Sequence, residues 1–260
     1  MARGLNAQQL QDCGAEMLVE TARLWLDLGF SSERKGGQFC INGVTGPDAY
    51  ETVVNNNAYT NLMARENLRY AAETVASLRT HTPDVYTALV HKTGLAPSEG
   101  EAWQRAAERI DVPYDEQRGI VPQDDSFLDR EPWDFQNTPS DRYPLLFYHS
   151  LDIYRKQVIK QADVLLAMFL LGEAFSLEAK RRNFAFYDPL TTGDSSLSSC
   201  IEAAHRGPDR RYKENEGVRA DGIADGSGRR GWQCEGRLPY RLDGRYLDDA
   251  HLRVWRHAGR

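Results

Sequence analysis

Residues 43–78 read GVTGPDAYETVVNNNAYTNLMARENLRYAAETVASL and contain both a polar loop and the start of a long helix. From about Asn57 onward, apolar residues return every three or four positions, which is the period of one helical face. The asparagines in front of this pattern are typical helix caps. The stretch therefore predicts a loop rich in hydrogen-bonding groups and then a helix whose apolar stripe is Leu62, Met63, Leu68, Tyr70, Ala71, Val75 and Leu78.

The same helical period recurs on both sides of this stretch. It predicts an amphipathic helix over residues 8–28 and shorter helices over 83–92 and 100–110. A further long helix is expected over 152–172, and a short strand over 38–42. Because the sequence shows no series of alternating strands, we expect an all-α fold whose helices are joined by polar loops.

Residues 112–144 interrupt the helical pattern. They contain five prolines among many acidic and aromatic residues. A long irregular segment in a compact domain is usually functional or disordered, and the aromatic side chains argue against disorder. This segment is therefore expected to be ordered but irregular.

Composition narrows the classes of protein to consider. The chain has 260 residues, 41% of them hydrophobic, and a net charge of -6, which allows a buried core and does not favour nucleic acid or an anionic membrane as a partner. The longest apolar run, residues 164–171, is too short to span a bilayer, and the first residues lack a signal-peptide pattern. The cysteine and histidine spacings match no common metal site. We therefore expect a cytoplasmic protein that binds a small or neutral ligand and no metal, nucleic acid or membrane.

Three segments in this order resemble glycoside hydrolase family 65: GVTGPDAYETVVNNNAYTNLMARENL (43–68), PWDFQNTPSDRYPLLFYHSLDIYRKQVIKQADV (132–164) and FYDPLTTGDSSLS (186–198). The family contains inverting phosphorylases of maltose, trehalose and kojibiose, together with related hydrolases. The resemblance implies that residues 1–204 form the later helices of a partial (α/α)6 barrel. It further implies cleavage of an α-linked glucose disaccharide without a cofactor, with inorganic phosphate as a possible co-substrate, in a full-length parent that can be oligomeric.

In the family this loop normally reads Gly-Pro-Asp-Glu-Tyr, and its Glu is the general acid that protonates the departing oxygen. The present sequence has Ala49 at that position. General acid catalysis typically contributes about 10²- to 10⁴-fold, and a methyl group has no proton to give. Asp48 and Glu51 flank the gap but leave the backbone at other angles, so rescue by either is the less favoured alternative. We therefore expect the chain to be inactive as given. For the asparagines of the loop, ligand contact and helix capping are equal alternatives. The residues concerned are Asn55, Asn56 and Asn57.

Other site residues also follow from the resemblance. Lys160 and Gln161 match the pair that contacts substrate hydroxyls; from the residues alone, a solvated pair on an amphipathic helix is the alternative. Ser195 and Ser196 match the phosphate-binding segment, where hydroxyls and amides ahead of a helix suit an anion, and an ordinary helix cap is the alternative. Many phosphorylases of the family have His where Gly193 stands, which leaves hydrolysis open. The aromatic residues of 112–144 either stack on sugar rings or pack the loop, the candidates being Trp133, Phe135 and Tyr143.

The last part of the chain, residues 205–260, has another character. Residues 206–260 contain twelve Arg, one Lys and nine Gly, without helical periodicity. When residues 225–252 are back-translated and shifted by one nucleotide, they permit MDLADVGGNVKDGCHIASMGGTWMMLT, which is the closing segment of the family. We hypothesise a frameshift near residues 205–208 and a poorly ordered tail. Two alternatives stay open: a sugar-binding pseudoenzyme, and an interaction protein whose basic tail binds polyanions.

Overall fold

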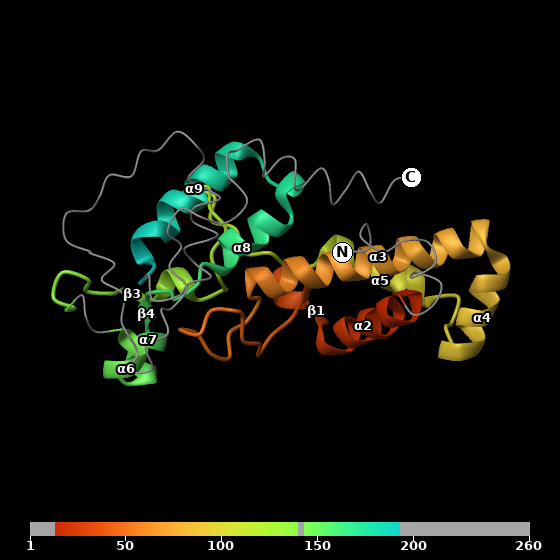
Figure 1. Ribbon diagram of the computed structural model, residues 1–260, viewed down its shortest axis with the longest axis horizontal. Coiled ribbons are helices and arrows are strands. Elements are labelled where there is room, and N and C mark those ends of the chain that lie inside the picture. Colours follow the sequence, from red (N-terminus) through yellow and green to blue (C-terminus); the bar gives the residue numbers. More distant parts are fainter. Residues whose placement is uncertain (1–13, 140–142, 193–260) are drawn as a thin grey trace, which may run out of the picture.

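The computed structural model describes residues 14–139 and 143–192, and this part of the chain is mostly helical (Figure 1). The helical expectation is thus confirmed. The α-helices are α2 (Ala15–Leu28), α3 (Ala58–His81), α4 (Pro83–Thr93), α5 (Glu99–Arg109), α6 (Pro144–Phe147), α7 (Ser150–Tyr154), α8 (Asp163–Leu170) and α9 (Leu177–Tyr187). The 3₁₀ turns are η3 (Glu33–Lys35), η4 (Phe127–Asp129), η5 (Gly172–Ala174) and η6 (Asp188–Leu190).

Two short ladders accompany the helices. Strands β1 (Phe30–Ser32) and β2 (Gln38–Cys40) pair antiparallel, with Ser31 opposite Phe39. Strands β3 (Glu131–Pro132) and β4 (Lys156–Gln157) pair in parallel. The strand expected over 38–42 is therefore present as β2. None of the helices in the described ranges is long and apolar enough to cross a membrane.

Helix α3 is the central element of the fold. It begins where the Asn57 side chain accepts a hydrogen bond from Thr60 N at 2.9 Å, which satisfies one of the free amides of the first turn. It ends before Pro83, whose fixed φ suits the first turn of α4. The predicted stripe faces the interior, where Leu62, Leu68, Ala71 and Leu78 are buried.

Helices α2, α4 and α5 pack on α3 and form the first hydrophobic core, around Val19, Leu68 and the fully buried Trp103. A second core lies at the other end of α3, where Ala58 meets Leu165 of α8 and Tyr187 of α9. Figure 1 shows α8 and α9 beyond the start of α3, on the far side from α4. The loop that precedes α3 is therefore placed where the two helical groups meet.

The prediction of one long helix over 152–172 is wrong. Helix α7 ends at Tyr154, and α8 begins only at Asp163. Between them the backbone is held by distant partners: Ile159 N donates to Leu190 O and Thr192 N donates to Ile159 O, both at 3.0 Å. These tertiary hydrogen bonds take the place of the helical ones that the local pattern favours. Residues 112–139 are irregular apart from η4 and β3, as expected.

Candidate functional site

The loop between β2 and α3 is closed at its base by two backbone hydrogen bonds between Val44 and Val54, at 3.0 and 2.8 Å. Ala49 lies in a turn of this loop, and its side chain is exposed. The residues on either side behave differently, because Asp48 and Tyr50 are each only 1% exposed. The loop therefore presents position 49 outward from a buried base.

Asp48 connects this turn to the segment before α8. Its Oδ1 accepts hydrogen bonds from the backbone N–H groups of Lys160 at 2.9 Å, Gln161 at 3.2 Å and Tyr50 at 3.2 Å. Its Oδ2 accepts from Gln123 Nε2 at 3.0 Å. The structure thus brings Ala49 close to Lys160 and Gln161, which are both half-buried. They lie outside any helix, so the alternative of a solvated pair on a helix face is wrong.

Two further buried carboxyl groups lie beside Asp48. Asn57 Nδ2 donates to Glu51 Oε1 at 2.8 Å and to Asp163 Oδ2 at 3.3 Å, and Gln123 Nε2 donates to Glu51 Oε2 at 2.9 Å. We call Asp48, Glu51 and Asp163 the carboxylate cluster. Two side-chain amides hold it together, and all three carboxyl groups belong to residues that are at most 3% exposed.

Burial is the main cause of the raised pKa values in the carboxylate cluster. It raises the pKa of Glu51 to about 7, and the negative charges of Asp124 and Asp48 act in the same direction. Burial also raises the pKa of Asp48, against the opposing effect of its hydrogen bonds. The pKa of Asp163 is raised well above its ordinary value by burial and then by its two acidic neighbours. Since each carboxyl group is enclosed, neither Asp48 nor Glu51 presents an acid at the surface beside Ala49.

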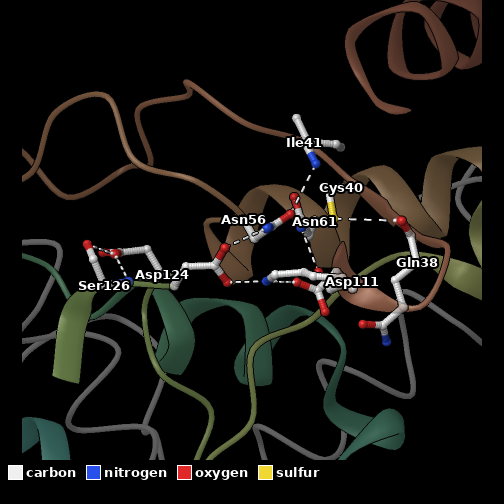
Figure 2. A network of polar contacts seen from close by, with 10 residues as sticks. Gln38, Cys40, Ile41, Asn56, Asn61, Asp111, Asp124 and Ser126 are labelled. Atoms are coloured by element: carbon white, nitrogen blue, oxygen red, sulfur yellow. Dashed lines mark hydrogen bonds and ion pairs between the residues drawn. The ribbon is translucent and has the colours of Figure 1, made fainter. Parts of the chain in front are cut away.

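The three consecutive asparagines all bind the protein itself. Asn55 Oδ1 accepts from Gly43 N at 3.1 Å, and Asn57 caps α3. Asn56 Oδ1 accepts from Ile41 N and from Asn61 Nδ2, both at 3.1 Å, as Figure 2 shows. Helix capping is therefore confirmed for Asn57, whereas Asn55 and Asn56 hold the loop itself.

A second polar network holds the same loop through Asn56. Lys35 Nζ lies 2.5 Å from Asp111 Oδ2 and 2.6 Å from Asp125 Oδ1, and Asn56 Nδ2 donates to the other oxygen of Asp125 at 2.7 Å. Asn61 Nδ2 donates to the Asp111 carbonyl at 2.6 Å (Figure 2). This network joins η3, the end of α5 and the 124–125 turn to the loop that carries Ala49.

Part of the segment expected to bind phosphate lies beside Lys160 and Gln161. Ile159 and Thr191 form a parallel β-bridge, so residues 191–192 leave from the position next to Lys160. Gly193, Ser195 and Ser196 lie outside the described residues, and so does the tail over 205–260.

The aromatic residues of the irregular segment differ in burial. Trp133 is buried, meets the Tyr148 ring edge to face with centroids 5.0 Å apart, and donates to Thr138 Oγ1 at 2.9 Å. It packs the loop. Phe135 is 38% exposed and Tyr143 is half-buried. Among residues 14–139 and 143–192, no cluster of three His, Cys, Asp or Glu side chains is arranged to hold a metal ion.

Comparison with known proteins agrees with the expected resemblance. The model of the glycosyl hydrolase family 65 central catalytic domain matches residues 4–213. The chain is 50% identical over 193 residues to the α,α-trehalose phosphorylase of Geobacillus stearothermophilus, which covers 74% of this chain and 25% of that protein. It is 35% identical over 193 residues to the kojibiose phosphorylase of Caldanaerobacter subterraneus subsp. tengcongensis, with 73% and 25% covered.

A solved structure shares the fold. The protein described as "Putative kojibiose phosphorylase from human microbiome" superimposes with a TM-score of 0.68 at 30% identity, over 76% of this chain and 27% of that one. The present chain spans about a quarter of the length of the curated relatives it matches.

Proposed function

The chain belongs to glycosyl hydrolase family 65, and we propose that it carries the sugar-binding part of a disaccharide phosphorylase site in which the proton donor is replaced by Ala49. The observation that carries this proposal is the link through Asp48, which sets an exposed position 49 beside Lys160 and Gln161. The family resemblance implies an acid at position 49. It implies that Lys160 and Gln161 contact the sugar hydroxyls.

The substrate class follows from the relatives. Trehalose, kojibiose and maltose phosphorylases resemble the chain at 50%, 35% and 35% identity, so we infer an α-linked glucose disaccharide and inorganic phosphate as the ligands. In such a site Lys160 and Gln161 would contact the sugar and Ser195 and Ser196 would hold the phosphate. The helices would form part of an (α/α)6 barrel, which the likeness to a solved phosphorylase supports.

The same arrangement supports binding without cleavage. An inverting mechanism needs a proton on the leaving oxygen while phosphate or water attacks the anomeric carbon. Ala49 has no proton to donate, and the neighbouring Asp48 and Glu51 are buried in the carboxylate cluster. We therefore infer a chain that holds a disaccharide but releases neither glucose nor glucose 1-phosphate at an appreciable rate.

The test combines calorimetric titration with a product assay. Trehalose, kojibiose and maltose are titrated into the chain with and without inorganic phosphate, and binding of at least one sugar is expected. The substitutions Lys160→Ala and Gln161→Ala should abolish it, whereas Glu108→Ala at an exposed position of α5 should not. Failure of all three sugars to bind would overturn the proposal.

The product assay addresses the missing acid. With phosphate, the unaltered chain should release no β-glucose 1-phosphate, and without phosphate it should release no glucose. Cleavage by the unaltered chain would contradict the role given to Ala49. Any cleavage that Ala49→Glu gains, by about 10²-fold or more, would assign the proton donor to this position.

A further inference from the structure

We propose that Asp48 is a positioning residue whose buried carboxyl group holds the turn carrying residue 49 at a fixed spacing from the Lys160–Gln161 backbone. The contacts that carry this inference are independent of any ligand. The role of Asp48 would be to align a group at position 49 with the side chains that contact the sugar. This role rests on the proposed function.

The first observation is the reach of this one carboxyl group. Asp48 Oδ1 accepts from backbone amides that lie 112 and 113 residues later in the chain, at 2.9 and 3.2 Å. The same oxygen accepts from Tyr50 N within its own turn at 3.2 Å. One atom therefore fixes both sides of the gap between the turn and the segment before α8.

The second observation is the way the other oxygen is held. Gln123 Nε2 donates to Asp48 Oδ2 at 3.0 Å and to Glu51 Oε2 at 2.9 Å. Gln123 is completely buried, and Asp48 is 1% exposed, so water does not compete for these bonds. Hydrogen bonds to a charged acceptor in such an environment are roughly twice as strong as neutral ones, and four of them leave the carboxyl group one orientation.

The third observation concerns the Lys160–Gln161 segment. Local periodicity favours a continuous helix here, yet α8 starts only at Asp163. The amides of Lys160 and Gln161 point at Asp48 instead of at carbonyl groups one turn earlier. The carboxyl group of Asp48 thus supplies the partner that the non-helical conformation requires, and it determines which way this segment faces.

Asp124 offers a matched control, because its charge also acts on Glu51 but its side-chain hydrogen bonds are local. Asp124 is also 1% exposed, and its carboxyl group accepts from Ser126 N at 2.8 Å and from Arg130 Nη2 at 2.6 Å. These bonds are confined to residues 124–130. Asp124→Ala therefore removes a buried carboxyl group without removing a bond to the Lys160–Gln161 segment.

Amide hydrogen exchange followed by NMR tests the link in the chain as it exists. In Asp48→Ala, the amides of Lys160 and Gln161 should exchange about 10- to 100-fold faster, which corresponds to the loss of a hydrogen bond to a charged group. Asp124→Ala should leave both amides unchanged. Unchanged exchange of these amides in a folded Asp48→Ala chain would overturn the proposal.

Asp48→Asn keeps the test decisive if the alanine variant does not fold. Asparagine retains an oxygen acceptor of the same geometry without the charge. We expect the exchange of Lys160 and Gln161 to accelerate about fivefold, with changes confined to the partners of Asp48, because the neutral bonds are weaker. An Asn variant in which these two amides exchange at the original rate would also contradict the link.

Titration with trehalose separates positioning from a purely structural role. Asp48→Ala should weaken trehalose binding at least tenfold, whereas Asp124→Ala should bind as tightly as the unaltered chain even where its thermal midpoint falls as far. Equal affinity of Asp48→Ala and the unaltered chain would overturn the positioning role. If the unaltered chain binds no trehalose, kojibiose or maltose, the proposed function fails, while the exchange result still decides whether Asp48 holds the segment.

Discussion

The side-chain amide of Asn57 donates a hydrogen bond to Glu51 Oε1 at 2.8 Å, while the oxygen of the same amide caps α3. One residue therefore starts the central helix and also supports the carboxylate cluster. The start of α3 and the position of the 46–51 turn are coupled through this side chain.

Replacement of Asn57 by alanine should be more costly than the loss of a helix cap alone. A lost cap costs about 1 kcal/mol, and two buried carboxyl groups that lose a donor add about 1–3 kcal/mol. We expect the free energy of unfolding to fall by about 2–4 kcal/mol, as measured by urea denaturation. Ser176→Ala is the control, because Ser176 caps α9 from an exposed position and supports no cluster. Equal losses in the two variants would contradict the coupling.

The raised pKa of Glu51 predicts a specific pH dependence. Its value is about 7 in the folded chain against 4.5 without perturbation, so the folded chain holds the proton over this interval. Folded stability then decreases as pH rises from about 4.5 to about 7, by on the order of 3 kcal/mol from this group. Glu51→Gln removes the titration, and its stability relative to the unaltered chain should increase across the same interval.

The measurement is the thermal midpoint of both chains at several pH values. Thr52→Ala is the control, since Thr52 is an exposed residue of the same loop and carries no titratable group. It should show a constant difference from the unaltered chain. A constant difference for Glu51→Gln as well would show that Glu51 does not bind a proton on folding.

Gly46 is predicted to tolerate no side chain. A Cβ at this position would lie less than 3.0 Å from Asp163 Oδ2, Asn57 Nδ2 and Glu51 Oε1. Gly46→Ala should therefore destabilise the chain by about 1–3 kcal/mol, the usual cost of overpacking. In Gly100→Ala, by contrast, the new Cβ meets only Val75 Cγ1, at 4.0 Å. Gly100 lies within α5, so Gly100→Ala should raise the free energy of unfolding by about 0.5–1 kcal/mol. The midpoints of chemical denaturation of the two variants should therefore shift in opposite directions.

Val53 is predicted to store backbone strain in the loop. Its φ is 43°, in the left-handed region that β-branched residues avoid, and its side chain is 72% exposed. Asparagine tolerates this conformation, so Val53→Asn should stabilise the chain by about 1 kcal/mol. Thr52→Asn, which changes an exposed neighbour outside this region, should leave the thermal midpoint within its error. A fall in the midpoint of Val53→Asn would show that the strain is absent.

Much of the helical framework was predictable from local pattern. The cap at Asn57, the apolar stripe of α3 and the short helices α4 and α5 all arise from interactions within a few residues. The interruption before α8 was not predictable, because the residues over 152–172 are periodic and give no local reason for a helix to stop. The reason lies at Asp48 and at the Leu190 carbonyl.

The sequence by itself determined the family, the helical class and that alanine stands at position 49, where we propose that the proton donor is missing, because motifs and helical periods are properties of neighbouring residues. Only the tertiary structure decided that Asp48 and Glu51 are buried and that Lys160 and Gln161 stand outside a helix. Burial and hydrogen bonding between residues more than a hundred positions apart depend on how helices pack. The composition of the loop therefore indicated many polar groups, and packing alone determined which of them face the protein and which position faces outward.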